Sequence, residues 1–170
     1  MFRTIRAALA ISAGVAVLVG SATTAHAANE PSVVRLQTET GGLCLTVNNG
    51  ALRNGVRVGM TTCADGLDNQ LFELAPIGSA MFEVRAKHSG KCLQDDGTGV
   101  PWQWLCNEGS RERWRVILVE VSKELYQLRP MHRPTDCLSI FYPIEGIGAL
   151  ITPCEGGDPY SKWRIQPVVR

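Results

Sequence analysis

Cys44-Leu45, Cys92-Leu93 and Cys137-Leu138 decide the fold, because the same dipeptide occurs three times at spacings of 48 and 45 residues. An aliphatic residue followed by arginine precedes each copy, a second cysteine follows it, and an aromatic residue comes eight or nine residues later. The order never varies, so the chain holds three copies of one unit. In chain order the arginine pairs are Val34-Arg35, Val84-Arg85 and Leu128-Arg129, the second cysteines are Cys63, Cys106 and Cys154, and the aromatic residues are Phe72, Trp114 and Trp163.

Each unit is predicted to contain four short strands separated by turn residues, which makes the fold class all-β. In the first unit Asn48-Asn49-Gly50 and Asn54-Gly55 supply the turns, because asparagine and glycine accept a positive φ at little steric cost. Helical periodicity is absent. The expected strands are 33–38, 44–47, 57–63 and 71–75, then 81–87, 92–95, 102–106 and 114–119, and finally 125–131, 137–141, 149–154 and 163–168.

Three such units favour a closed barrel with three-fold symmetry, since one four-stranded unit cannot enclose its apolar face alone. The units are bounded at about 33–78, 79–122 and 123–170 and leave no room for a second domain. The shared core is expected to combine the aliphatic residue before each arginine with the aromatic residue that ends the pattern. These residues are Val34, Val84 and Leu128 with Phe72, Trp114 and Trp163.

The six cysteines are expected to form one disulfide in each unit. Pairing within a unit joins its second strand to its third, and the repeat favours this arrangement over the other possible pairings. Each bond would contribute about 3 kcal/mol in the chain-entropy model. The expected pairs are Cys44 with Cys63, Cys92 with Cys106, and Cys137 with Cys154.

Residues 1–27 have the three-part layout of a secretory signal peptide. Arg3 and Arg6 precede an apolar stretch at 7–20, and Ala25-His26-Ala27 forms the cleavage site. We therefore expect a secreted domain at 28–170, and the oxidising environment outside the cell favours disulfides over metal ligation. A retained anchor is the alternative, but the small residues at 25 and 27 favour cleavage, and no later stretch reaches the roughly 20 apolar residues that a spanning helix needs. The alanine-rich leader favours a bacterial source.

The charge balance argues against nucleic acid as a partner. Without residues 1–27 the chain carries 15 basic and 16 acidic side chains. A nearly neutral domain cannot rely on counterion release for its affinity, so a neutral ligand rich in hydroxyl groups fits better than a polyanion.

The aromatic residue that ends each unit belongs to a degenerate Gln-x-Trp triplet. With three cysteine pairs in the same phase, these triplets resemble the ricin B-type β-trefoil lectins over the whole of 28–170. The resemblance implies a β-trefoil of three four-stranded repeats. It also implies a shallow sugar pocket in each repeat, in which a carboxylate bridges two hydroxyls and an aromatic ring stacks on the sugar. The triplets are Gln70-Leu71-Phe72, Glu112-Arg113-Trp114 and Ser161-Lys162-Trp163.

No repeat keeps the full set of pocket residues that the resemblance implies. The anchoring aspartate, two residues after the first cysteine, is replaced in all three repeats. The stacking aromatic residue, two before the second cysteine, is kept only in the second repeat, and the asparagine beside the triplet only in the first. The residues at these positions are Thr46, Gln94 and Ser139, then Thr61, Trp104 and Thr152, and then Asn69, Arg111 and Tyr160.

The second repeat is the best candidate for a carbohydrate-binding site. Trp102 and Trp104 share parity on one strand, so both rings are expected on one face. Gln94 on the facing strand can bond to adjacent hydroxyls, and a one-residue shift of register would bring Asp95 to the anchor position. The alternative is that the tryptophans cover the disulfide and that the Asp95-Asp96-Gly97 segment is only a turn. The candidates are Gln94, Asp95, Trp102, Trp104 and Arg111 of the second repeat, with Thr46 and Asn69 of the first repeat as weaker ones.

Other functions have less support in the sequence. No Cys-x-x-Cys motif or calcium loop is present, and three-fold symmetry would point His88 and His132 away from each other, so we expect no metal site and no cofactor. Catalysis is not expected, because the nearest carboxylates to the candidate site, Asp95 or Asp96 and Glu108, belong to no recognisable catalytic motif. The alternative function is protein binding or inhibition through the loops 48–54 and 142–148, helped by apolar side chains. These are Phe141, Tyr142, Pro143 and Ile144.

Overall fold

The computed structural model describes residues 32–155 and 158–168, and the predicted signal peptide at 1–27 lies outside these ranges. The described residues form twelve strands joined by turns and five single-turn 3-10 helices, which confirms the all-β prediction. No described helix is long and apolar enough to cross a membrane. The 3-10 helices are η1 (Asn48–Gly50), η2 (Asp68–Gln70), η3 (Ser110–Glu112), η4 (Val121–Lys123) and η5 (Pro159–Ser161).

Six strands close into a barrel in which every strand pairs with two neighbours. The ring runs β1–β4–β5–β8–β9–β12 and closes when β12 pairs with β1. Closure removes the exposed sheet edges that an open sheet of this size would present. The barrel strands are β1 (Ser32–Thr38), β4 (Leu71–Gly78), β5 (Met81–Ala86), β8 (Arg113–Glu120), β9 (Leu125–Pro130) and β12 (Trp163–Pro167).

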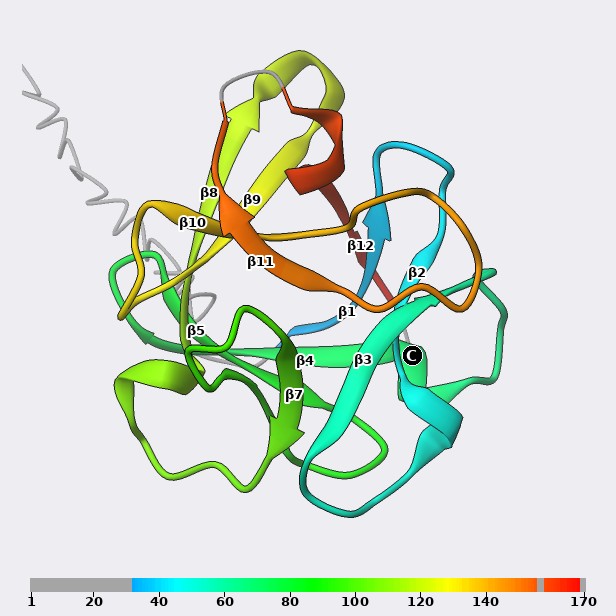
Figure 1. Ribbon diagram of the computed structural model, residues 1–170, viewed down its shortest axis with the longest axis vertical. Helices are drawn as coiled ribbons and strands as arrows, with labels where there is room; N and C mark the ends of the chain where they lie inside the picture. Colours follow the sequence, from blue (N-terminus) through cyan, green and yellow to red (C-terminus); the bar gives the residue numbers. More distant parts are fainter. Residues whose placement is uncertain (1–31, 156–157, 169–170) are drawn as a thin grey trace, which may run out of the picture.

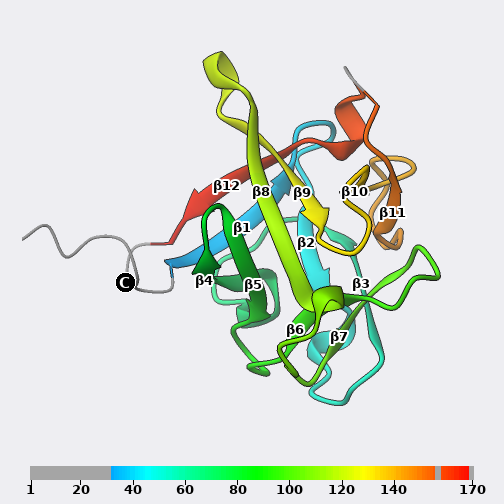
Figure 2. The same cartoon turned by 90° about the vertical axis from the view of Figure 1, so that its left-hand side faces the viewer.

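The other six strands form three hairpins, one after every first barrel strand of a repeat. Figure 2 shows the hairpin strands β3, β7, β10 and β11 on the side of the molecule opposite the β4–β5 turn. We call β1–β4, β5–β8 and β9–β12 the first, second and third repeats. The arrangement confirms the predicted β-trefoil of three four-stranded repeats. The hairpin strands are β2 (Cys44–Val47), β3 (Val56–Thr61), β6 (Cys92–Asp95), β7 (Pro101–Trp104), β10 (Asp136–Ser139) and β11 (Leu150–Pro153).

The barrel encloses the core that the repeat predicted. Its three aliphatic and three aromatic positions are all buried, with exposed fractions of 2% or less. The indole N–H of Trp114 donates to the carbonyl of Leu93 at 2.8 Å, and that of Trp163 to Leu138 at 2.9 Å. Each ring therefore fills the core and also fixes the strand that follows its repeat's first cysteine. Phe72 fills the same place in the first repeat without a donor.

Three disulfides join the cysteines in the pairs that the repeat predicted. They link Cys44 to Cys63, Cys92 to Cys106, and Cys137 to Cys154. Each ties the start of a repeat's second strand to the segment that follows its third strand. Each hairpin is thus covalently closed at the end opposite the turn that joins its two strands.

Candidate functional site

The hairpin β6–β7 of the second repeat presents three of the predicted residues on one face. Gln94 lies opposite Trp102, and Cys92 lies opposite Trp104. Residues directly opposite in an antiparallel pair point to the same side, and residues two apart on a strand do so as well. The register therefore places Gln94, Trp102 and Trp104 on one surface of the hairpin.

A pocket of about 500 Å³ opens on this surface. It contains four predicted residues, Gln94, Trp102, Trp104 and Arg111, together with Asp96 and Gly55. Trp104 is 44% exposed, whereas the aromatic residues of the core are buried, so its ring is available to a ligand. The amide of Gln94 makes no hydrogen bond with the other described side chains or backbone, which leaves both its donor and its acceptor free.

Asp96 supplies the carboxylate of this pocket. Partial burial opposes ionisation of Asp96, but hydrogen bonds from the Thr98 side chain and backbone, with the positive charge of Arg111, hold its pKa below the ordinary value of 3.8. Both Thr98 bonds, at 2.7 and 2.9 Å, fall on Oδ1. Oδ2 accepts no hydrogen bond from a described residue, so this carboxylate of the pocket lining keeps one oxygen free to accept.

The loop before β8 positions Arg111. The buried carboxylate of Glu112 accepts hydrogen bonds from the backbone N–H groups of Asn107 at 2.6 Å and Gly109 at 3.0 Å. This fixes the turn that carries Arg111, whose guanidinium donates to the Asp96 carbonyl at 2.8 Å. Glu112 occupies the first place of the second Gln-x-Trp triplet, so the carboxylate at this position holds the turn that carries Arg111 to the pocket.

The first repeat forms one wall of the pocket, because β3 pairs with β7 at the boundary of the two repeats (Figure 1). A Cβ atom at Gly55 would lie 3.2 Å from the Trp104 ring, so glycine is needed for the ring to lie against the backbone there. Gly55 also has φ +69°, which disfavours other residues. On the neighbouring ring, the guanidinium carbon of Arg57 lies 4.8 Å from the centroid of Trp102, a cation–π contact.

Gln103, between the two tryptophans, points the other way and holds the two repeats together. It is 1% exposed, and its amide donates to the carbonyls of Ala51 and Arg53. Its backbone carbonyl accepts from the N–H of Gly55 at 3.0 Å, and Ser89 donates to its side-chain oxygen at 2.8 Å. One residue thereby fixes the loop that carries Gly55 beneath Trp104.

Asp95 lies outside the pocket, which corrects the expectation that it replaces the missing anchor. The register does not shift, so Asp95 lies opposite Pro101, on the other face of the hairpin. Its carboxylate is fully buried, and its Oδ2 lies 3.2 Å from Nε2 of His132 and 3.4 Å from a guanidinium nitrogen of Arg133. Asp95 therefore links the second repeat to the third, and its neighbour Asp96 brings the carboxylate to the pocket.

The corresponding positions of the other two repeats are closed by pairs of hydroxyl groups. Thr46 is buried and its hydroxyl lies 2.7 Å from that of Thr61. In the third repeat, Ser139 and Thr152 form the same pair at 2.7 Å. Asn69 donates to the Val47 carbonyl at 3.0 Å and so braces the first hairpin. The structure does not bring Thr46 or Asn69 to the pocket of the second repeat.

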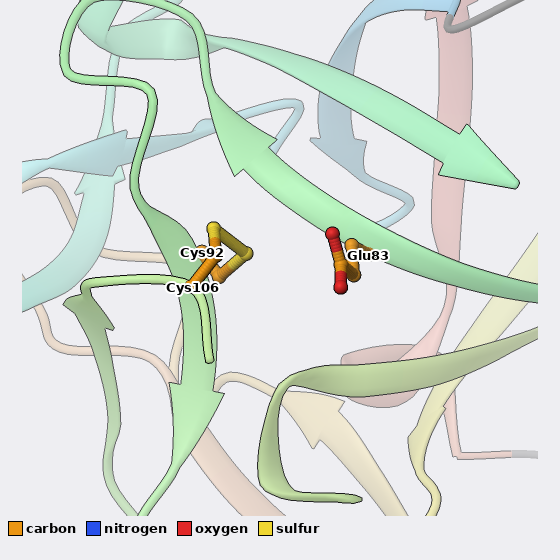
Figure 3. A group of neighbouring side chains, drawn as sticks. All are labelled: Glu83, Cys92 and Cys106. Carbon is orange, nitrogen blue, oxygen red and sulfur yellow. A yellow bond between two sulfur atoms is a disulfide. The ribbon is translucent and has the colours of Figure 1, made fainter. Parts of the chain in front are cut away.

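One cluster of side chains consists of residue types that can bind a metal ion. Glu83, Cys92 and Cys106 place their potential ligand atoms within 4.8 Å of one another. Figure 3 shows that the two sulfur atoms are bonded to each other. A disulfide offers no thiolate, and Oε2 of Glu83 accepts a hydrogen bond from Nε of Arg85 at 3.0 Å. This group is therefore structural.

The pocket residues that sequence reasoning did not select as site residues are Gly55, Asp96 and, next to the pocket, Arg57 and Gln103. Gly55 and Arg57 come from another repeat, and contacts between repeats leave no mark in the pattern of one repeat. A usable signal exists for Gln103. Its position between two tryptophans that share the opposite face of the strand points it into the protein, where a polar side chain needs partners.

Comparison with known proteins identifies the family. The chain belongs to the ricin-type β-trefoil lectin domain family, whose model matches residues 32–163. A comparison of the sequence with curated proteins finds no match. The shared fold explains the three-fold pattern of cysteines and aromatic residues from which the sequence argument began.

Solved structures with the same fold differ widely in size. The designed three-fold symmetric protein ThreeFoil has a TM-score of 0.70 and 24% identity, covering 80% of this chain and 99% of that one. The C-terminal half of an earthworm R-type lectin in complex with GalNAc has a TM-score of 0.63 and 17% identity, covering 81% and 100%. An exo-β-1,3-galactanase from Clostridium thermocellum has a TM-score of 0.70 and 18% identity. The match covers 81% of this chain but 30% of that enzyme.

Proposed function

We propose that this protein is a secreted, non-catalytic lectin that binds carbohydrate through the pocket of its second repeat. One observation carries the proposal: two tryptophan rings, a free amide and an ionised carboxylate line one open pocket. A sugar ring has an apolar C–H face and polar edges, so it requires this combination of an aromatic surface and oriented hydrogen-bonding groups. The family supports the same conclusion, since lectin domains bind carbohydrate and are commonly without catalysis.

The pocket residues divide the work of binding a sugar. The exposed ring of Trp104 stacks on the C–H face, while the Gln94 amide and Oδ2 of Asp96 bond to neighbouring hydroxyls. Arg111 lies at the edge of the pocket and donates to a further oxygen. Asp96 takes the part of the family's anchoring aspartate from a position two residues farther along the chain than the pattern predicts.

Secretion is the second part of the proposal. The leader layout at 1–27 predicts export, and the three disulfides of the domain are consistent with an oxidising compartment. The full chain should be expressed in an exporting bacterial host and the product examined by intact-mass spectrometry. A mass that starts at Ala28 with three disulfides is the expected result, and a product that keeps its leader would contradict cleavage.

The function is tested by applying the exported protein to a broad glycan and polysaccharide array. The variant Trp104→Ala removes an exposed ring of the pocket, and Phe141→Ala removes an exposed ring elsewhere as the matched control. We expect saturable binding by the wild-type protein and the control, and loss of binding by Trp104→Ala with an unchanged melting temperature. Silence of the wild-type protein across the array, or full binding by Trp104→Ala, would refute the proposed site.

Protein recognition is the second candidate function, and one surface favours it. Phe141, Tyr142 and Ile144 are each more than half exposed. The two aromatic rings meet edge to face, with their centroids 4.6 Å apart. Exposed apolar groups in a cluster are typical of contact surfaces. If the wild-type protein binds nothing on the array, the double variant Phe141→Ser with Ile144→Ser should show less self-association or partner binding than the wild-type protein purified in the same way. Unchanged behaviour of this variant would exclude the patch.

A further inference from the structure

A second pocket of about 300 Å³ adjoins the first across the boundary of the first and second repeats. The two pockets share Gly55 and Trp102, so they form one continuous groove. The remaining lining of the second pocket comes from the first repeat, from the loop after β2 and the start of β3. Its polar side chains are Asn48, Asn49, Arg53 and Arg57.

The two ends of the groove differ in charge. The lining of the second pocket contains two arginines and no acidic residue. Arg53 and Arg57 are exposed, and neither guanidinium forms an ion pair or a hydrogen bond with the described residues. In the first pocket, by contrast, Asp96 is balanced by Arg111. The second pocket therefore carries an uncompensated positive charge even though the chain as a whole is almost neutral.

The second pocket is also preorganised. Gln103 holds the carbonyls of Ala51 and Arg53, and His88 Nε2 lies 3.3 Å from the Ala51 carbonyl. The contact of Arg57 with the Trp102 ring restricts that guanidinium over the shared wall. The Arg57 guanidinium held in this way, beside Arg53 on a fixed backbone, matches the planar oxygens of a carboxylate or the oxygens of a sulfate.

We infer that the groove binds an acidic glycan, with a sugar in the first pocket and the carboxylate or sulfate of the linked sugar held by Arg53 and Arg57 in the second. This inference rests on the proposed function, because it takes the first pocket as the sugar site. The exposed amides of Asn48 and Asn49 supply bonds to the hydroxyls of the second sugar. A uronic acid and a sulfated sugar share the recognised chemistry, an anionic group one sugar away from the stacked ring.

Matched pairs of oligosaccharides test the inference. Titration calorimetry would compare galactobiose with digalacturonate, cellobiose with cellobiouronate, and lactose with sulfated lactose. The variants Arg53→Gln and Arg57→Gln remove the charges of the second pocket, and Arg115→Gln removes an exposed arginine that also lacks an ion pair in the described residues as the control. Trp104→Ala is measured in parallel as the variant of the first pocket.

We expect the acidic member of at least one pair to bind about tenfold more tightly at low salt, which corresponds to about 1.4 kcal/mol. Combining Arg53→Gln with Arg57→Gln should remove this preference, so that the acidic and neutral members of a pair bind with similar affinity, whereas Arg115→Gln should keep the preference. The carboxylated and sulfated pairs show which anion fits better. Added salt should reduce the preference, because the arginines are exposed.

Three results would overturn the inference in distinguishable ways. Equal affinity for neutral and acidic members, with binding lost in Trp104→Ala, would leave the lectin and remove the anionic subsite. Binding of polyphosphate, a polyanion without sugar, as tight as that of the acidic oligosaccharides would show simple ion exchange. Absence of binding to every neutral and acidic probe would remove the proposed function together with the inference.

Discussion

The hairpins of the first and second repeats have the same register, but only the hairpin of the second repeat lines the pocket that contains Trp104. In both, the first cysteine lies opposite the residue two positions before the second cysteine, Thr61 in one repeat and Trp104 in the other. Thr61 pairs with the hydroxyl of Thr46 and closes the surface, whereas Trp104 leaves a pocket beside Gln94. Residues at two positions of a shared hairpin scaffold therefore distinguish a repeat that has an open pocket from one that does not.

The neighbouring loop adds to this difference. Gly59, opposite Thr46, bridges to Gly148, and a Cβ there would lie 2.8 Å from the Ile147 carbonyl. The third repeat thus covers the place where the first repeat would hold a ligand. In the second repeat the equivalent neighbour is β3, which lies just after Gly55 and leaves the Trp104 ring open to solvent. The loops between repeats decide access, and the residues within a repeat decide chemistry.

The largest expected effect comes from removing one disulfide, in the second repeat in one variant and in the third repeat in another. Replacing both Cys92 and Cys106 by serine, or both Cys137 and Cys154, opens loops of similar length, with separations of 14 and 17 residues. Each change should lower the free energy of unfolding by about 3 kcal/mol. Only the first should also weaken glycan binding, because Cys92 lies opposite Trp104. Urea unfolding and titration calorimetry measure the two effects, and equal losses of binding would contradict a single site.

A smaller change should close the open pocket. The double variant Gln94→Ser with Trp104→Thr gives the second repeat the hydroxyl pair of the third, at the same register. We expect binding to fall by about tenfold to a hundredfold, since the stacking surface is lost. The melting temperature should stay close to that of the wild-type protein, because the Trp104 ring is exposed. Retained binding would show that the ligand lies elsewhere.

Gln103→Ala tests the joint between the two repeats. Loss of its buried hydrogen bonds to Ala51 and Arg53 should cost about 1–3 kcal/mol of stability. Binding should weaken a few-fold, because the loop with Gly55 is no longer fixed beneath Trp104. Gln127→Ala, which removes a buried glutamine of the third repeat, is the control and should affect stability alone. The readouts are chemical unfolding and glycan affinity.

The sequence predicted the strands, the disulfides and the core because all three recur with the repeat. The choice of Trp102 and Trp104 followed from parity on a strand, and the structure places both on the same pocket. The prediction for Asp95 was wrong because it required a one-residue register shift, whereas pairing of Cys92 with Trp104 leaves Asp95 on the buried face. There it meets Arg133 of the third repeat, a contact 38 positions away that no local pattern predicts.

The contribution of the first repeat was beyond the reach of the sequence for the same reason. Gly55 was predicted as a turn residue, and its positive φ is observed. Its second property, the close approach of the Trp104 ring, depends on how β3 meets β7. Arg57 likewise gains its position over Trp102 only when the two repeats pack. Contacts between repeats have to be seen in three dimensions, because each repeat can be described without them.

The smallest expected effect is that of pH on the open pocket. Asp96 and Arg111 are the titratable groups among the residues that line it. Partial burial of Asp96 is outweighed by its Thr98 hydrogen bonds and the Arg111 charge, so its pKa is lowered from 3.8. A lowered carboxyl pKa means that the binding form is fully present above 3.8 and is lost only as the pH falls further.

Affinity for a neutral glycan should therefore stay constant from about pH 8 to pH 5, since Asp96 remains ionised throughout that range. Asp96→Asn should bind several-fold more weakly than the wild-type protein between about pH 8 and pH 5 and should lose the decline below 3.8, because its amide does not titrate. Thr98→Val should move that decline to higher pH by removing the side-chain hydrogen bond on Oδ1. Calorimetry from about pH 8 to below pH 3.8 checks all three, and a midpoint above pH 5 in the wild-type protein would assign the titration to a group other than Asp96.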